Sequence, residues 1–364
     1  MTRAEHDVDV AVIGAGPAGT AAAVTLRRAG VRVALLTGPR RPGRAAIGQS
    51  APPGTDRVAR DVFGARGFEA AEHLRSLGNR SAWGDGDPVL TDFMFNPFGT
   101  GWHLDRVAFD ARLVACAADV GVDVLHGATV ERTIWDGGWE VTARTAGAPF
   151  TVRAARVCDA SGRRAVVART HGARLVHRDR LVAVVSSAPR APGDHDHTSL
   201  VEAGADGWWY TAPCPGGTRA FVWFTDPDLL DRRLSTSPDG FADAVRRSRH
   251  VATHLGGPLE VPAVVPAGTA HLDAPTGRGW VAAGDAVATF DPLSSQGIVT
   301  ALLTGRDAAR AVLGDLGGEP TTGYERQWRR VLDAYADERA TWYAAETRFP
   351  ESSFWNRRGR RRAA

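Results

Sequence analysis

The chain has 364 residues, of which 43% are hydrophobic and 23% charged, a composition typical of a folded globular protein. A formal net charge of +3 gives no reason to expect a nucleic-acid partner, and no apolar run reaches the roughly 18 residues that a membrane-spanning helix needs. The N-terminus lacks the apolar core of a signal peptide, so we expect a cytoplasmic protein. Three widely spaced cysteines predict neither disulfides nor a metal site, and the absence of lysine excludes mechanisms that need a lysine amine.

A strand, a glycine-rich turn and a helix begin the chain. The apolar run 7–13 predicts a buried parallel strand, residues 20–29 predict an alanine-rich helix, and a second strand follows. In the turn, Gly14 permits a tight bend, Gly16 lets the backbone approach a pyrophosphate, and Gly19 lets the helix pack closely on the strand. The helix N-terminus would face the anion. The pattern predicts dinucleotide binding through Gly14, Ala15, Gly16, Pro17, Ala18 and Gly19.

The end of the second strand departs from the usual dinucleotide pattern. Thr37 stands where an acidic residue would bind the adenosine ribose, and Arg40 and Arg41 follow shortly after. Arginines here would suit the 2′-phosphate of NADP. Because the rest of the chain indicates FAD, we interpret the missing acid as a weaker or rearranged ribose contact and expect modest FAD affinity.

The middle of the chain divides into two parts. The first part ends at residue 162. Its predicted elements are a helix at 109–120, a strand at 122–125 and an antiparallel ribbon at 139–144 and 151–156. Alternating apolar and aromatic residues at 181–213 and 219–225 then predict a curved antiparallel sheet that would roof a substrate cavity. Helices are predicted at 238–256 and 324–347, and we expect the arginine-rich tail 357–362 to be a solvated, frayed end.

A second candidate cofactor motif lies far downstream. A strand at 280–286 ends in a Gly-Asp pair whose carboxylate could accept hydrogen bonds from ribityl hydroxyls. The loop at 291–298 would present backbone amides to a flavin, and the helix at 299–313 would direct its positive end at the flavin pyrimidine, which stabilises the anionic reduced flavin. The residues of this motif are Gly284, Asp285, Pro292, Gln296, Gly297 and Ile298.

Together with the Asp-Ala-Ser-Gly-Arg segment at 159–163, the two motifs resemble the superfamily of p-hydroxybenzoate-type hydroxylases, flavin halogenases and geranylgeranyl reductases. The resemblance covers nearly the whole chain. Several signatures resemble one branch, the flavoproteins that mature tryptophylquinone enzymes, such as the partner of lysine ε-oxidase. These signatures lie at 47–50 with 52–53, 81–84, 101–106 with 109–110, 207–213 and 224–228. That branch usually has glutamate where Gln49 stands, so the chemistry of this loop is expected to differ.

The resemblance implies an α/β fold with a Rossmann-like FAD-binding domain, an inserted antiparallel-sheet substrate domain and a C-terminal helix. The implied boundaries are 1–80, 104–170 and 270–318 for the FAD-binding domain, 81–103 and 171–269 for the substrate domain, and 319–364 for the C-terminal helix and basic tail. It also implies that Arg44, Gln49 and Ser50 border the ribityl chain and isoalloxazine. Arg106 would contact the cofactor from its helix, and Val130 would meet the adenine through its backbone.

The resemblance favours hydroxylation of an electron-rich aromatic, such as a tryptophan or indole, through a flavin hydroperoxide formed with O2. The branch implies a peptidyl tryptophan in a partner protein, and a free or carrier-bound aromatic is the rival. Electrons would come from NAD(P)H or from reduced flavin supplied by a partner reductase. The candidate catalytic residues are His103 and Tyr210, which could transfer a proton, and Trp209. Four tryptophans lie in segments expected to line the cavity: Trp83, Trp102, Trp208 and Trp209.

Three other functions are weighed against hydroxylation. In an oxygen-independent dehydrogenase or reductase, FAD would exchange a hydride with a natural-product intermediate, as in geranylgeranyl reductases. A flavin halogenase passes hypohalous acid to a lysine, which this sequence lacks. The third alternative is a non-catalytic, flavin-bound scaffold for a partner protein. The near-complete set of cofactor motifs argues against it, because a scaffold does not need them.

Overall fold

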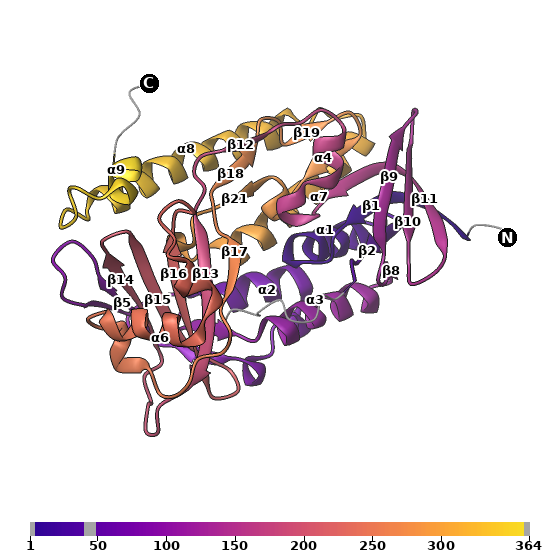
Figure 1. Ribbon diagram of the computed structural model, residues 1–364. Coiled ribbons are helices and arrows are strands. Elements are labelled where there is room, and N and C mark those ends of the chain that lie inside the picture. Colours follow the sequence, from indigo (N-terminus) through magenta and orange to yellow (C-terminus); the bar gives the residue numbers. More distant parts are fainter. Residues whose placement is uncertain (1–3, 40–48, 360–364) are drawn as a thin grey trace.

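The first layer of the fold is a mainly parallel sheet that carries the glycine-rich turn at the end of its central strand (Figure 1). The computed structural model describes residues 4–39 and 49–359. Neighbouring strands are parallel in the order β8-β2-β1-β11-β20, and β19 is antiparallel to β20. The strands are β1 (Ala4–Ile13), β2 (Val33–Leu36), β8 (Asp123–Leu125), β11 (Pro149–Asp159), β19 (Thr276–Gly277) and β20 (Trp280–Ala282). Both faces of the sheet are covered, which explains the continuous apolar run in its central strand.

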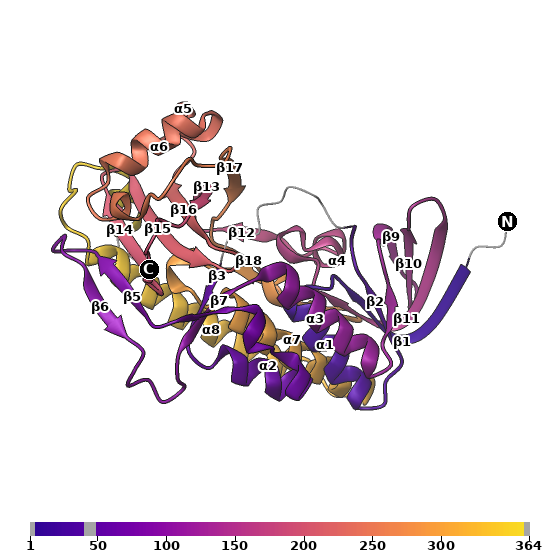
Figure 2. The same cartoon turned by 90° about the horizontal axis from the view of Figure 1, so that it is seen from below.

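Helices and a β-ribbon cover opposite faces of this sheet. Helices α1 (Pro17–Arg28), α3 (Arg106–Asp119) and α7 (Gly297–Leu316) pack on one face with α2 (Thr55–Phe63) beside them (Figure 2). The ribbon of β9 (Thr129–Trp135) and β10 (Trp139–Arg144) continues antiparallel from β11 and covers the other face with α4 (Val166–Thr170). Small residues let α1 and α7 approach closely, because a Cβ at Gly305 would overlap the carbonyl oxygen of Ala18.

The second large sheet has seven strands in the order β17-β13-β16-β15-β14-β5-β6. All its neighbours are antiparallel except β14 and β5, which are parallel. Its strands are β5 (Gly78–Ala82), β6 (Val89–Asp92), β13 (Val182–Pro189), β14 (Thr198–Gly204), β15 (Gly207–Cys214), β16 (Thr218–Thr225) and β17 (Ala263–Pro266). One face packs against α5 (Arg232–Thr236) and α6 (Pro238–Arg247), and the other against the C-terminal helices, so both faces are apolar.

Two small sheets join the large ones. In the first, β7 (Gly101–Leu104) lies between β3 (Gln49–Ala51) and β4 (Leu74–Ser76). The second consists of β12 (Leu175–His177), β18 (Ala270–Leu272) and β21 (Ala288–Thr289). These elements confirm the predicted fold class, a Rossmann-like domain with an added antiparallel sheet and C-terminal helices. No helix in the described part of the chain is long and apolar enough to cross a membrane.

The C-terminal part consists of two helices, α8 (Thr322–Ala344) and α9 (Ser353–Gly359), which extend from the parallel sheet to the second sheet (Figure 1). The prediction that residues 357–362 form a frayed end is wrong for residues 357–359. Arg358 is buried and its Nη2 lies 2.5 Å from Oδ1 of Asp226, while Arg357 bridges Asp226 and Asp228. A buried carboxylate such as Asp226 needs a cationic partner, and these arginines provide it. Residues 360–364 lie outside the described residues.

The hydroxyl of Tyr324 fixes the start of α8 to the parallel sheet. This buried side chain donates a hydrogen bond of 2.7 Å to the carbonyl of Ala282 at the end of β20. Replacing it by phenylalanine leaves that bond unmade, and we expect Tyr324→Phe to lower the free energy of unfolding by about 1–2 kcal/mol. Urea unfolding measures the loss. An unchanged midpoint and slope would show that the hydroxyl does not contribute to stability.

Candidate active site

The three glycines of the first turn have different surroundings. Gly14 has a φ of +105°, and a Cβ there would overlap the carbonyl oxygen of Ala160. A Cβ at Gly19 would overlap the carbonyl oxygen of Gly14, so both glycines are required by backbone contacts. Gly16 is exposed, and a Cβ there would meet no atom of the described residues within 4 Å. The turn therefore has a tightly packed base and an open face at Gly16.

The open face coincides with the N-terminus of α1. Gly16 is the N-cap residue and Pro17 is the first helical residue, whereas Ala18 is buried against α7. The first turn of a helix has backbone N–H groups without intrahelical acceptors and carries a partial positive charge. In the part of the chain that the structure describes, no side chain caps this helix, and its first turn contains no acid. Gly16, with Ala15 beside it, thus offers the cradle that a dinucleotide pyrophosphate needs.

The segment under the turn is held by a buried aspartate. Asp159, at the end of β11, accepts hydrogen bonds from the N–H and Oγ of Ser161 and from the N–H groups of Val167 and Ala168. These bonds fix the position of Ala160, whose carbonyl contacts Gly14. The Asp-Ala-Ser segment at 159–161 therefore supports the glycine-rich turn through the contact of Ala160 with Gly14.

The downstream Gly-Asp pair lies against the same helix. Gly284 has a φ of +60°, and a Cβ there would come within 2.6 Å of the Ala18 side chain. The next side chain, Asp285, is about half exposed, and its Oδ2 lies 3.9 Å from Nε of Arg163. The second motif is thus folded onto the first, with a carboxylate at the surface that could accept hydrogen bonds from ribityl hydroxyls.

The loop at 291–297 leads into a second helix N-terminus. Pro292 lies in a short 3-10 turn, Gln296 is the exposed N-cap of α7, and Ile298 is buried in the core. Gly297, the first residue of α7, is exposed, and among the described residues no atom lies within 4 Å of a Cβ placed there. The loop therefore presents backbone and an uncapped helix N-terminus to open space, as binding of a flavin pyrimidine requires.

The remaining predicted cofactor residues that the structure describes lie on three different elements, α3, β9 and β3. Arg106 begins α3, and its Nη2 is 3.0 Å from Oδ2 of Asp110. Val130 is partly buried on β9, where its backbone is paired with β10. Gln49 belongs to β3, in register with Leu104 of β7. Arg44 lies outside the described residues.

Three polar side chains form a hydrogen-bonded chain between β3, β7 and β15. Ser50 Oγ lies 2.8 Å from Nδ1 of His103 and 2.6 Å from the hydroxyl of Tyr210. The other ring nitrogen of His103, Nε2, lies 3.1 Å from the carbonyl oxygen of His197. A carbonyl only accepts, so Nε2 carries the proton and Nδ1 accepts from Ser50. Ser50 in turn accepts from Tyr210, which fixes the direction of the whole chain.

The protonation states of this chain follow from its burial. His103 is fully buried, and desolvation lowers its pKa to about 4, helped by the nearby cation Arg219. Burial raises the pKa of Tyr210 to about 12, with the hydrogen bond to Ser50 opposing the rise. Both groups are therefore neutral at pH 7. The neutral imidazole keeps an acceptor nitrogen toward Ser50, as the hydrogen-bond direction requires.

Trp209 does not join this group. It alternates with Tyr210 along β15 and packs on the opposite face of the sheet, with ring centroids 4.8 Å from Trp223 and 5.5 Å from Phe241. The other three tryptophans expected to line a cavity are packed in the protein. Trp83 and Trp208 join the aromatic cluster under the C-terminal helices, and Trp102 packs against the ring of Phe68.

Two surface pockets are not lined by Ser50, His103 or Tyr210, although the smaller one includes Trp102, next to His103 in β7. The larger, of about 470 Å³, is lined by Arg132, Thr133, Ile134, Trp135, His171, Arg278 and Trp280. The smaller, of about 300 Å³, is lined by Asp56, Arg60, Ala70, Arg75, Phe98, Gly99, Thr100 and Trp102. Neither of these two pockets is lined by the glycine-rich turn.

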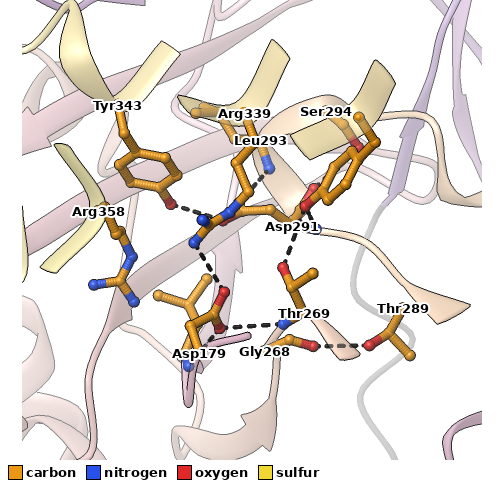
Figure 3. A network of polar contacts seen from close by, with 12 residues as sticks. Asp179, Gly268, Thr269, Thr289, Asp291, Leu293, Ser294, Arg339, Tyr343 and Arg358 are labelled. Carbon is orange, nitrogen blue, oxygen red and sulfur yellow. Dashed lines mark hydrogen bonds and ion pairs between the residues drawn. The ribbon is translucent and has the colours of Figure 1, made fainter. Parts of the chain in front are cut away.

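Sequence reasoning missed the side chains that hold the 291–297 loop in place. Asp291, before Pro292, is buried and bonded to three residues of α8: Tyr335, Arg339 and Tyr343 (Figure 3). Their spacing of four residues was a visible signal, because it places all three on one helix face. Nothing in the sequence identifies their partner, so the spacing alone does not predict the contact with Asp291.

Comparison with known proteins agrees with this geometry. The family model described as "FAD dependent oxidoreductase" matches residues 9–180. The putative FAD-dependent oxidoreductase LodB of Marinomonas mediterranea is 27% identical over 96% of both chains. A menaquinone reductase of Mycobacterium tuberculosis is 30% identical over 84% of this chain and 76% of its own length.

Two solved structures share the fold. The flavin-dependent halogenase CmlS superposes with a TM-score of 0.83 at 23% identity, covering 100% of this chain and 68% of its own. The peptidyl tryptophan dihydroxylase QhpG superposes with a TM-score of 0.75 at 22% identity, covering 97% of this chain and 79% of its own.

The cradle at Gly16, the surface carboxylate of Asp285 and the uncapped start of α7 together fit an FAD molecule. The matches to both relatives extend over most of the chain. The protein therefore belongs to the FAD-dependent oxidoreductases.

Proposed function

We propose that this enzyme hydroxylates an electron-rich aromatic, a tryptophan or indole that is free, carrier-bound or part of a peptide. The observation that carries the proposal is the hydrogen-bonded chain from Tyr210 through Ser50 to His103. Hydroxylation of an aromatic carbon releases the ring proton that the new oxygen replaces. A phenol linked to a buried neutral imidazole can accept such a proton, which gives these residues a role in the reaction.

The proton transfer follows the bond directions in the structure. The oxygen of Tyr210 takes the substrate proton while its own proton moves to Ser50, and the Ser50 proton moves to Nδ1 of His103. The His197 carbonyl holds the imidazole by Nε2 and stabilises the imidazolium that results. Reduced FAD, when bound, supplies the activation of O2. The protein's own contribution is orientation of the substrate and temporary storage of one proton.

The comparisons support the proposal through two proteins. The name of QhpG describes a peptidyl tryptophan dihydroxylase, and its fold matches 97% of this chain. LodB, a putative FAD-dependent oxidoreductase, matches almost the whole length of both chains. The halogenase fold of CmlS is equally shared, but the sequence contains no lysine to carry the halogenating species. We infer that electrons come from NAD(P)H or a separate flavin reductase, and that O2 is the co-substrate.

The test supplies the FAD-loaded enzyme with a flavin reductase, NADPH, isotopically labelled O2 and either indole or a tryptophan-containing peptide. Mass spectrometry should show one labelled oxygen in the product. A similarity to menaquinone reductase makes an oxygen-independent reductase the second candidate. Reduction or oxidation of the substrate without label, or a halogenated product in the presence of halide, would overturn the proposal.

A serine substitution tests the role of the hydrogen-bonded chain. Ser50→Ala interrupts the path between Tyr210 and His103, and we expect kcat for the hydroxylation to fall at least about tenfold. The matched control is Ser187→Ala on β13, away from the group. FAD content should be unchanged in both variants. A kcat for Ser50→Ala equal to that of the control would remove the proton-transfer role.

A further inference from the structure

A buried polar network surrounds Asp291, the first residue of the 291–297 loop (Figure 3). Its side chain is 0% exposed, and its Oδ2 lies 2.8 Å from the hydroxyl of Tyr343 and 3.2 Å from Nε of Arg339. Its Oδ1 accepts from the N–H of Leu293, and its own N–H donates to the hydroxyl of Tyr335 at 2.6 Å. Asp291 is thus held at its backbone and at both carboxylate oxygens.

The network extends from α8 to a third segment of the chain. Nη2 of Arg339 lies 2.8 Å from Oδ2 of Asp179, whose Oδ1 accepts from the N–H groups of Leu181 and Thr269. The Tyr335 hydroxyl, which accepts from the N–H of Asp291, also lies 3.2 Å from Thr269 Oγ1. One guanidinium therefore joins two carboxylates that are more than a hundred residues apart.

The three α8 residues lie on a single helix face. Tyr335, Arg339 and Tyr343 follow one another at intervals of four residues, and the ring of Tyr343 lies 4.9 Å from the Arg339 guanidinium carbon. Because α8 is long and fixed at its start by Tyr324, it presents these groups as one rigid surface. This surface determines where residue 291 can lie.

The position of residue 291 affects the helix that follows. Only the short turn at 292–294 and the positive-φ residue Ser295 separate it from Gln296 and Gly297. Those residues form the uncapped N-terminus of α7, which faces open space at Gly297. A displacement of Asp291 would therefore move the amides and the helix end that a flavin ring would contact.

We propose that Arg339 is a positioning residue for the cofactor: through its contacts with Asp291 and Asp179 it holds the 291–297 loop in place and so sets the affinity and reduction potential of the bound flavin. It acts through Asp291 and does not itself touch the flavin. The inference depends on FAD binding at α7 and is independent of the substrate that the enzyme oxidises. The network carries two carboxylates and one guanidinium, so removal of the cation leaves excess negative charge near the flavin.

The test measures the midpoint potential of the FAD-loaded protein by equilibration with a reference dye, and FAD dissociation by fluorescence. For Arg339→Gln we expect the dissociation constant of oxidised FAD to rise about tenfold. The dissociation constant of reduced FAD should rise by about a further factor of ten. By the thermodynamic cycle, that second factor lowers the two-electron midpoint potential by about 30 mV. Arg339→Lys keeps the charge but cannot reproduce both contacts, and should give an intermediate potential.

Two further variants separate positioning from stability. Arg330→Gln removes the same charge from the exposed side of α8 and should leave the potential and FAD affinity unchanged. Tyr343→Phe removes one hydrogen bond from Asp291 while keeping Arg339, so it provides a folded variant should Arg339→Gln fail to fold. A lower thermal stability of Arg339→Gln or Tyr343→Phe with unchanged potential and FAD affinity would overturn the proposal. An equal shift of potential in Arg330→Gln would also do so.

Discussion

Gly16→Val should yield a folded protein that no longer binds FAD. Gly16 has a φ of −73° and a ψ of −177°, values that any residue adopts, and a Cβ there would lie within 4 Å of no atom in residues 4–39 and 49–359. The valine would instead fill the space in which the pyrophosphate approaches the start of α1. The measurement is flavin absorbance of the purified protein together with its circular dichroism spectrum and thermal unfolding.

Two other glycine substitutions provide the controls. Gly147→Val also adds a side chain in open space, in the loop before β11, and should keep its FAD. Gly19→Ala should fail to fold, because its Cβ would overlap the Gly14 carbonyl and the strand–helix packing would have to open. Retention of FAD by folded Gly16→Val would place the pyrophosphate elsewhere and contradict the cradle described above.

Acidification should destabilise the protein through His103 by about 3 kcal/mol. Its pKa is about 4 in the folded protein and 6.5 in the unfolded chain, because burial disfavours the charged imidazole. A folded pKa below the unfolded value means that the contribution is fully present above pH 6.5. It is lost as the pH falls from 6.5 to about 4, where the unfolded chain binds the proton first. Denaturant unfolding across this range measures the loss.

A substitution isolates the histidine from other titrating groups. His103→Gln removes the imidazole, so its unfolding free energy should fall less steeply between pH 6.5 and 4 than that of the original protein. His195→Gln, at an exposed position, serves as the control and should keep the original slope. Parallel curves for the His103 variant and the original protein would show that His103 is not the group responsible.

Much of the parallel-sheet domain could be predicted from local sequence patterns. The helix predicted at 109–120 is α3, which begins earlier because Asp105 caps it by accepting hydrogen bonds from Val107 and Ala108. The strand predicted at 139–144 has the same bounds as β10. By contrast, the pairing of β1 with β11 joins residues about 150 positions apart, and no local pattern specifies it. The resemblance to a family predicts that segments 1–80 and 104–170 share one domain, but it does not give this strand pairing.

The site could be predicted only residue by residue. Ser50, His103 and Tyr210 were each singled out, but their hydrogen bonds depend on the register of β3 with β7 and on the approach of β15, across 53 and 160 positions. Trp208 and Trp209 are both buried because both faces of β15 are covered. An alternating pattern cannot then indicate which tryptophan faces the flavin side. Likewise, the partner of Arg358 is Asp226, a residue that its own sequence neighbourhood does not reveal.

The docking of α9 has a consequence for the order of folding. Trp83 and Trp208, made early and midway in synthesis, pack against Tyr343, and Trp83 also packs against Trp355, near the end of the described chain. Until the ribosome has released these later residues, a large aromatic surface of the second sheet stays uncovered. At roughly 5–20 residues per second, that interval lasts several seconds or longer. The nascent chain is therefore exposed to aggregation during synthesis and is a natural client for chaperones that bind apolar segments.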